Sequence, residues 1–80
     1  MPNLSRHRRN PALVALGKVI RELRIASSLT QEQLAFTAEL DRSYVGQVER
    51  GDSNVALLNL KSIAEALGTT VEDLMQRASL

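Results

Sequence analysis

The short distance between two predicted helices in the middle of the chain limits the possible folds more than any other feature. Thr30 is a favourable N-cap residue and Gln33 follows three residues later, as in a capping box, so a helix is expected from there to about Ala38. Asp41, the next N-cap candidate, comes only three residues after that end. Two helices separated by so short a turn must pack against each other.

Start and stop signals predict one helix before this pair. Asn10 followed by Pro11 is typical of an N-cap with proline at the first helical position. We expect this helix to end between residues 26 and 28. Its apolar residues recur at helical spacing: Leu13, Leu16, Ile20 and Leu23.

Two further helices are predicted after the pair. Gly51 can close the helix that starts after Asp41, and Gly68 can close a fourth helix whose apolar residues lie between 57 and 67. Thr70 caps a fifth helix. No segment has strand periodicity, so an all-α fold of five helices is predicted, with a flexible basic N-terminal arm over residues 1–10 and one domain over 11–80.

Bulk composition excludes several classes of protein. The 80 residues include no cysteine, which excludes disulfides and cysteine-based metal sites, and they contain no long apolar run of the kind found in membrane spans or secretory signals. A cytoplasmic protein is therefore expected. The net charge is only +1, but residues 1–24 carry +5 and the remainder −4. A basic end of this kind is typical either of a DNA-binding surface or of a solubilising tail.

The central pair of helices has the residues that a helix-turn-helix requires. Ala35 is small, as the helix crossing demands, and Leu40 can fill the turn. Val45 and Val48 can anchor the second helix in the core. The face left for the DNA major groove is polar or small: Arg42, Ser43, Gly46, Gln47 and Arg50. Gly46 is unfavourable inside a helix, and close approach of another surface would explain it.

The run LTQEQLAFTAELDRSYVGQVERGDSN, followed by LLNLKSIAEALGTTVEDL, resembles the Cro/phage-repressor (XRE) class of helix-turn-helix regulators over roughly residues 13–75. The segment LDRSYVG…VERG…NV…LLNL is most similar to the small controller proteins of restriction–modification systems. The resemblance implies a lambda-repressor-like DNA-binding domain that acts as a homodimer on a two-fold symmetric operator in double-stranded DNA.

The resemblance also implies residue roles. The residues expected to contact base edges are Arg42, Ser43 and Gln47. Those expected to contact the DNA backbone are Gln31, Tyr44, Arg50, Ser53 and Asn54. Arg24 and Glu49 match an ion pair that joins the first helix to the recognition helix. Without the helix-turn-helix frame, Arg42 and Gln47 would be interpreted as solvated helix residues, and Tyr44 could equally belong to the core.

Four positions depart from the family pattern. Glu39 stands where the turn usually has glycine, and because a left-handed glutamate is strained, we expect the turn to differ slightly from the family pattern. Asp52 replaces a residue that is often basic, Val55 replaces a frequent proline, and Ala56 is a poor cap for the fourth helix. Together these departures suggest modest affinity for each subunit.

The fifth helix and the arm leave alternatives open. Five short helices cannot bury every apolar residue, so we expect Val71, Leu74 and Met75 to form a dimer interface, although they could instead belong to the core. Residues 6–9 of the basic arm could reach along DNA or be disordered in the free protein. His7, the only histidine, is not expected to bind a metal or act in catalysis.

A protein-binding helix-turn-helix module, such as an antitoxin or an anti-repressor target, is the alternative function. Four acidic residues flank the predicted DNA face: Glu39, Asp41, Glu49 and Asp52. An enzyme is the least favoured class, because no catalytic set can be assembled from these residues. No cofactor, small-molecule ligand or membrane partner is expected.

Overall fold

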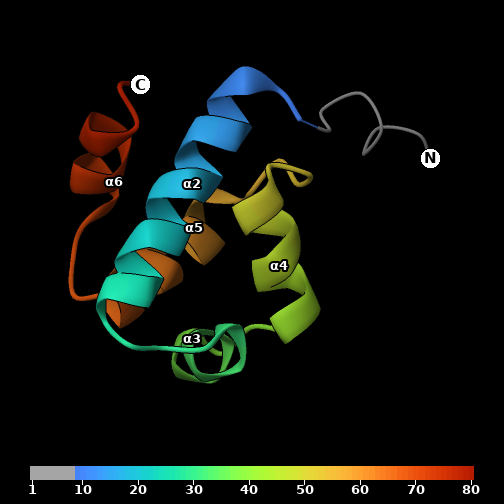
Figure 1. Cartoon of the computed structure of the whole chain (residues 1–80), viewed down its shortest axis with the longest axis vertical. Helices are drawn as coiled ribbons and strands as arrows, with labels where there is room; N and C mark the ends of the chain where they lie inside the picture. The colour runs from blue at the N-terminus through green and yellow to red at the C-terminus, as the bar shows by residue number, and fades with distance from the viewer. Residues whose placement is uncertain (1–8) are drawn as a thin grey trace.

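The computed structural model describes residues 9–80, and the described part of the chain consists of five helices without a strand. These are α2 (Pro11–Ala26), α3 (Gln31–Ala38), α4 (Arg42–Arg50), α5 (Leu57–Ala66) and α6 (Val71–Arg77) (Figure 1). The predicted all-α, five-helix fold is confirmed. None of these helices has the length and apolarity that a membrane crossing requires.

The predicted caps begin three of the helices. Thr30 and Gln33 form the complete capping box of α3, in which the Thr30 Oγ1 accepts the Gln33 N–H and the Gln33 Oε1 accepts the Thr30 N–H. Asn10 Oδ1 accepts the Ala12 N–H at the start of α2, and Thr70 Oγ1 accepts an N–H at the start of α6. Asp41 occupies the predicted N-cap position of α4, but its side chain makes no cap hydrogen bond.

The turn between α3 and α4 accommodates Glu39 where the family usually has glycine. This residue is left-handed, with φ 60° and ψ 43°, and its N–H donates to the last turn of α3. The Leu40 N–H donates to the Ala35 carbonyl over 2.8 Å, and the Leu40 side chain packs against the core. The tight turn is therefore closed by main-chain bonds and by one apolar side chain, as predicted.

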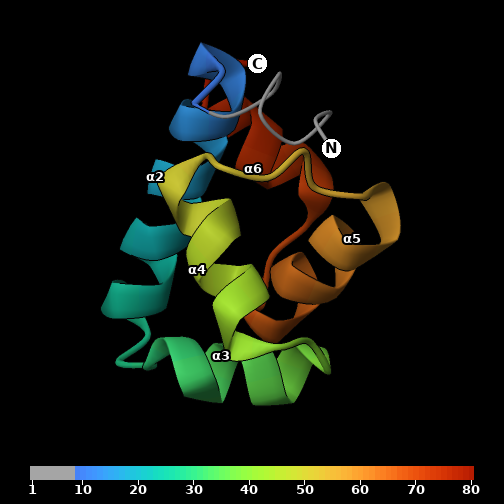
Figure 2. The ribbon, with the colours of Figure 1, turned by 90° about the vertical axis from the view of Figure 1, so that its right-hand side faces the viewer.

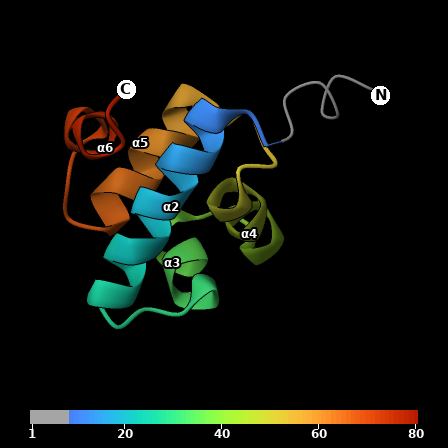
Figure 3. The same ribbon diagram turned by 45° about the horizontal axis from the view of Figure 1, so that its top comes forward.

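All five helices contribute to one hydrophobic core. Helix α2 packs against α4 and α6, while α3 packs against α4 and α5. Helix α3 is seen end-on in Figure 1 and along its length in Figure 2, where α4 rises beside it. Figure 3 shows α6 on the side of α2 away from α4, and α5 packs against α3 and α6. The largest fully buried side chains come from every helix: Ile20, Leu34, Val45, Ile63 and Leu74.

Two glycines allow α2 and α4 to approach each other closely. A Cβ atom added to the buried Gly17 would clash with the Val48 carbonyl oxygen and lie 2.6 Å from the Glu49 carbonyl oxygen. A Cβ atom added to Gly51, which has φ 77°, would lie 2.8 Å from Val14 Cα. Because these neighbours are backbone atoms, they cannot move without separating the helices.

We expect Gly17→Ala to destabilise the fold by about 3 kcal/mol or more, because the methyl group would push α4 away from α2. Urea denaturation followed by circular dichroism measures the free energy of unfolding. Lys18→Ala, at the exposed neighbouring position, is the control and should change stability little. A Gly17→Ala protein as stable as the parent would contradict the close approach described here.

Candidate DNA-binding surface

Helix α4 has one buried and one exposed side. Val45, Val48 and Glu49 are buried against the rest of the domain. The residues predicted to contact base edges, Arg42, Ser43 and Gln47, are all exposed, and so is Arg50. The structure therefore places these polar side chains on one free surface, which is available to another molecule.

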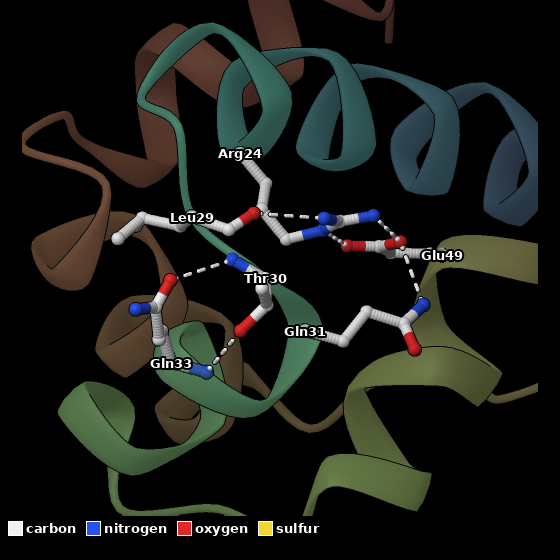
Figure 4. A network of polar contacts seen from close by, with 6 residues as sticks. All are labelled: Arg24, Leu29, Thr30, Gln31, Gln33 and Glu49. Carbon is white, nitrogen blue, oxygen red and sulfur yellow. Dashed lines mark hydrogen bonds and ion pairs between the residues drawn. The ribbon is translucent and has the colours of Figure 1, made fainter.

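A buried ion pair connects α2 to α4 (Figure 4). Arg24 Nε lies 2.6 Å from Glu49 Oε2, and Arg24 Nη2 donates to Glu49 Oε1 over 3.0 Å. The side chain of Glu49 is only 2% exposed and that of Arg24 is 11% exposed. Hydrogen bonding to Glu49 raises the pKa of Arg24 above its ordinary value, so the guanidinium stays charged. The predicted ion pair is thus present in bidentate form.

The same carboxylate also holds Gln31, the first residue of α3. Gln31 Nε2 donates to Glu49 Oε1 over 3.0 Å (Figure 4). Arg24 additionally donates to the Leu29 carbonyl over 2.9 Å, which fixes the chain just before α3. Since an amide nitrogen carries two N–H groups, Gln31 keeps a second donor while Glu49 orients it.

Similar proteins identify the family of this chain. The helix-turn-helix family model matches residues 20–74. The control protein C.BamHI of Bacillus amyloliquefaciens is 39% identical over 67 residues, covering 82% of this chain and 83% of the relative. The chain belongs to the helix-turn-helix family, in its XRE-type branch.

Two further proteins support the membership. The control protein C.SmaI of Serratia marcescens is 43% identical over 65 residues, covering 81% of this chain and 77% of that protein. The crystal structure of the restriction-modification controller protein C.AhdI from Aeromonas hydrophila superposes with a TM-score of 0.76 at 53% identity, covering 78% of this chain and 94% of that one. The lambda-repressor-like fold is therefore confirmed, and the family is a class of regulators rather than of enzymes.

In this helix-turn-helix protein the predicted backbone-contact residues do not form one uniform surface. Asn54 is exposed, but Ser53 is only 8% exposed, so its side chain offers little surface to a phosphate. Tyr44 is half-buried, packs against the core and accepts a hydrogen bond from Asn59 Nδ2 over 3.2 Å. The phosphate contact expected of Ser53 therefore stays a prediction, at a position where the side chain is largely buried, and Tyr44 joins α4 to α5.

Arg50 and Asp52 form an exposed pair at the end of α4. Arg50 Nε lies 3.1 Å from Asp52 Oδ2, and the Arg50 side chain is 59% exposed. The sequence pattern indicated only that Asp52 lacks the positive charge common at its position. The structure shows that Asp52 instead holds the side chain of a neighbouring cation.

Arg9, which the sequence analysis placed in the basic arm, is bonded to the end of α4. The Arg9 N–H donates to the Gly51 carbonyl over 2.7 Å, and Arg9 Nη1 donates to the Arg50 carbonyl over 3.0 Å. The predicted flexible arm of residues 1–10 is therefore wrong at its last two positions, since Arg9 is bonded to the end of α4 and Asn10 caps α2. The other arm residues singled out, Arg6, His7 and Arg8, lie outside the described residues.

The predicted dimer interface also needs correction. Leu74 is fully buried in the core of its own chain, so it cannot contact a second copy. Val71 and Met75 are half-buried and pack against the same core. The exposed apolar side chains of this region are instead Leu57 and Leu58, at 67% and 74% exposure. Helical periodicity could not distinguish a core face from an interface face on so short a helix.

Within residues 9–80 no group of three or more histidine, aspartate or glutamate side chains is arranged to hold a metal ion. The polar side chains of the candidate surface come instead from α3, α4 and the loop that follows. These side chains can donate hydrogen bonds to an anionic partner. Their arrangement therefore suits the binding of such a partner.

Removing one member of the buried pair should destabilise the fold strongly. We expect Glu49→Ala to cost about 3–5 kcal/mol, because Arg24 would remain buried without its partner. Denaturant unfolding measures the change. Arg77→Ala is the matched control, since it breaks the exposed Arg77–Asp73 pair and should have a far smaller effect. If Glu49→Ala lowered the free energy of unfolding as little as Arg77→Ala does, the Arg24–Glu49 pair would not support the fold.

Proposed function

We propose that this protein is a transcriptional regulator that binds a specific sequence in double-stranded DNA as a homodimer. The observation that carries the proposal is the exposed face of α4, which presents Arg42, Ser43 and Gln47 while the opposite face is buried. A recognition helix in the major groove requires this division between an anchored and a free side.

The exposed side chains of α4 suit base recognition. Arginine pairs with guanine through two hydrogen bonds and glutamine pairs with adenine, and each such contact contributes about 1–3 kcal/mol of discrimination. Ser43 can donate to or accept from several base edges. We assign Arg42, Ser43 and Gln47 to base contacts on this chemistry and on their exposure.

Backbone contacts would hold the recognition helix in register. We assign them to Gln31, Arg50 and Asn54, with Tyr44 at the edge of the surface, and assign no side-chain contact to Ser53. Gln31 is supported by its orientation through Glu49 and by its place at the N-terminus of α3, where helix geometry favours anions. Arg50 is supported by its charge and its exposure.

A second copy of the chain would cover the apolar groove between α5 and α6. Leu57, Leu58 and Val71 line this groove, and the two leucines are among the most exposed large apolar side chains described. Two-fold pairing of helix-turn-helix domains places their recognition helices about one DNA turn apart. We therefore propose this groove, rather than the buried Leu74, as the dimer interface.

The regulated genes belong, in this proposal, to a restriction–modification system, because two relatives are named control proteins and a third is named a restriction-modification controller. The protein would act in the cytoplasm, where its operator lies, and would need no cofactor, membrane or small-molecule ligand. Repression or activation would follow from the position of the operator relative to the promoter.

The alternative of a protein-binding module loses part of its support in the structure. Of the four acidic residues that suggested it, Glu49 is buried and bonded to Arg24, and Asp52 is paired with Arg50. Only Glu39 and Asp41 remain as exposed acidic side chains of that set.

Selection from a random duplex library tests the DNA-binding proposal. We expect enrichment of two inverted half-sites about one helical turn apart. Arg42→Ala and Gln47→Ala should each lose about 10- to 100-fold in affinity for the selected site and relax selection at one position of each half-site. Glu22→Ala, an exposed change on α2 outside both α4 and the proposed dimer groove, is the control. If both α4 variants bound every duplex as the parent does, the proposal would be wrong.

The proposed dimer interface has its own test. We expect Leu58→Glu to shift the protein from dimer to monomer in sedimentation analysis, because the charge would be buried between two copies. Phe36→Glu is the matched control, since Phe36 is 84% exposed on α3, away from the groove. A dimer that survives Leu58→Glu and dissociates with Phe36→Glu would place the interface on α3 instead.

A further inference from the structure

Gly46 lies inside the recognition helix, where glycine is unfavourable, and it is buried although its neighbours along the helix surface are polar. Its backbone is helical and it is not among the residues with positive φ, so the turn geometry does not require glycine here. The reason for glycine must therefore lie in the atoms that surround it.

Two polar side chains occupy the space that a side chain at position 46 would take. A Cβ atom built there would lie 3.2 Å from Arg50 Nη1, 3.6 Å from Gln31 Oε1 and 3.8 Å from Gln31 Nε2. The first distance is shorter than an ordinary van der Waals contact, whereas the two distances to Gln31 are not. A methyl group at this position would thus force the end of the Arg50 side chain to shift by a few tenths of an ångström and would leave Gln31 in place.

Both side chains are held at their other contacts. Asp52 accepts a hydrogen bond from Arg50 Nε, and Glu49 accepts one from Gln31 Nε2. The guanidinium of Arg50 therefore folds back over its own helix, so that it and the Gln31 amide border the same space above Gly46. This arrangement brings a cationic donor from the end of α4 next to a neutral donor from the start of α3.

We propose that Gly46 is a positioning residue that keeps the Arg50 guanidinium beside the Gln31 amide, so that the two act on one stretch of the DNA backbone. The ligand class is the phosphodiester group, since an arginine and an amide donor together suit an anionic oxygen. The inference rests on the proposed function, and it adds that recognition by this helix depends on the absence of a side chain at position 46.

A double-mutant cycle on Gly46 and Arg50 tests the proposal. The four proteins are the parent, Gly46→Ala, Arg50→Gln and the double variant, each titrated with the selected operator duplex at several salt concentrations. We expect Gly46→Ala to raise the melting temperature by several degrees, on the order of 5 °C, because alanine favours the helix. Ser62→Ala on α5 is the control for altered stability without a change at the DNA surface.

Binding should change in the opposite direction to stability. We expect Gly46→Ala to weaken operator binding by roughly 3- to 10-fold and to make the slope of log affinity against log salt shallower by about one, as the loss of one phosphate contact does. In the Arg50→Gln background, Gly46→Ala should weaken operator binding by less than about two-fold, because the guanidinium that the methyl group would shift is already absent.

Three results would overturn the inference. Equal losses from Gly46→Ala in both backgrounds would mean that the methyl group meets DNA directly and that Arg50 is not involved. Unchanged affinity and salt slope would mean that the position of Arg50 does not matter. A parent protein without selective binding would contradict the proposed function itself, and this would be apparent before any variant is compared.

Discussion

The close contact between α2 and α4 is the constraint on which the rest of the structure depends. The backbones meet where Gly17 has no side chain, and again where Gly51 turns against Val14. About two turns further along α2 from Gly17, the Arg24 guanidinium is paired with Glu49 on the buried side of α4. With the helix fixed at these points, its opposite side has no packing role, and the polar residues there are free to meet a partner. A recognition helix only nine residues long would have little stability without such support.

The Glu49 carboxylate also connects fold stability with the geometry of the surface. It accepts hydrogen bonds from Arg24, which belongs to the structural core, and from Gln31, which belongs to the proposed interface. A buried ion pair often contributes little net stability because both charges lose their water. Here the pair orients the helices, because one carboxylate bonds to α2 and to the first residue of α3 and so fixes both relative to α4. The exposed end of α4 is held in a different way, by the Arg9 bonds to its last carbonyls and by the Arg50–Asp52 pair.

Local signals in the sequence were sufficient for the elements and for the exposed face of α4. The Thr30–Gln33 capping box and the anchoring valines Val45 and Val48 depend on residues close together in the chain, and each is present as predicted. The errors concern properties that depend on packing between distant segments. Leu74 and Ser53 are buried in the folded domain, and Arg9 bonds to residues more than forty positions away. The role of Gly17 was missed because the sequence alone does not show which backbone packs against a glycine in a helix. The base-contact and backbone-contact assignments remain proposals.

The separation of the two sides of α4 has a consequence for how such proteins diverge. Arg42, Ser43 and Gln47 are exposed and make no side-chain hydrogen bond among the described contacts, so selection can replace them with little risk to folding. New operator preferences are then reachable by single substitutions from a common ancestor, while the buried half of the same helix stays constrained by α2. Duplicated genes could in this way acquire separate DNA targets, and their products would not interfere with one another in the same cell.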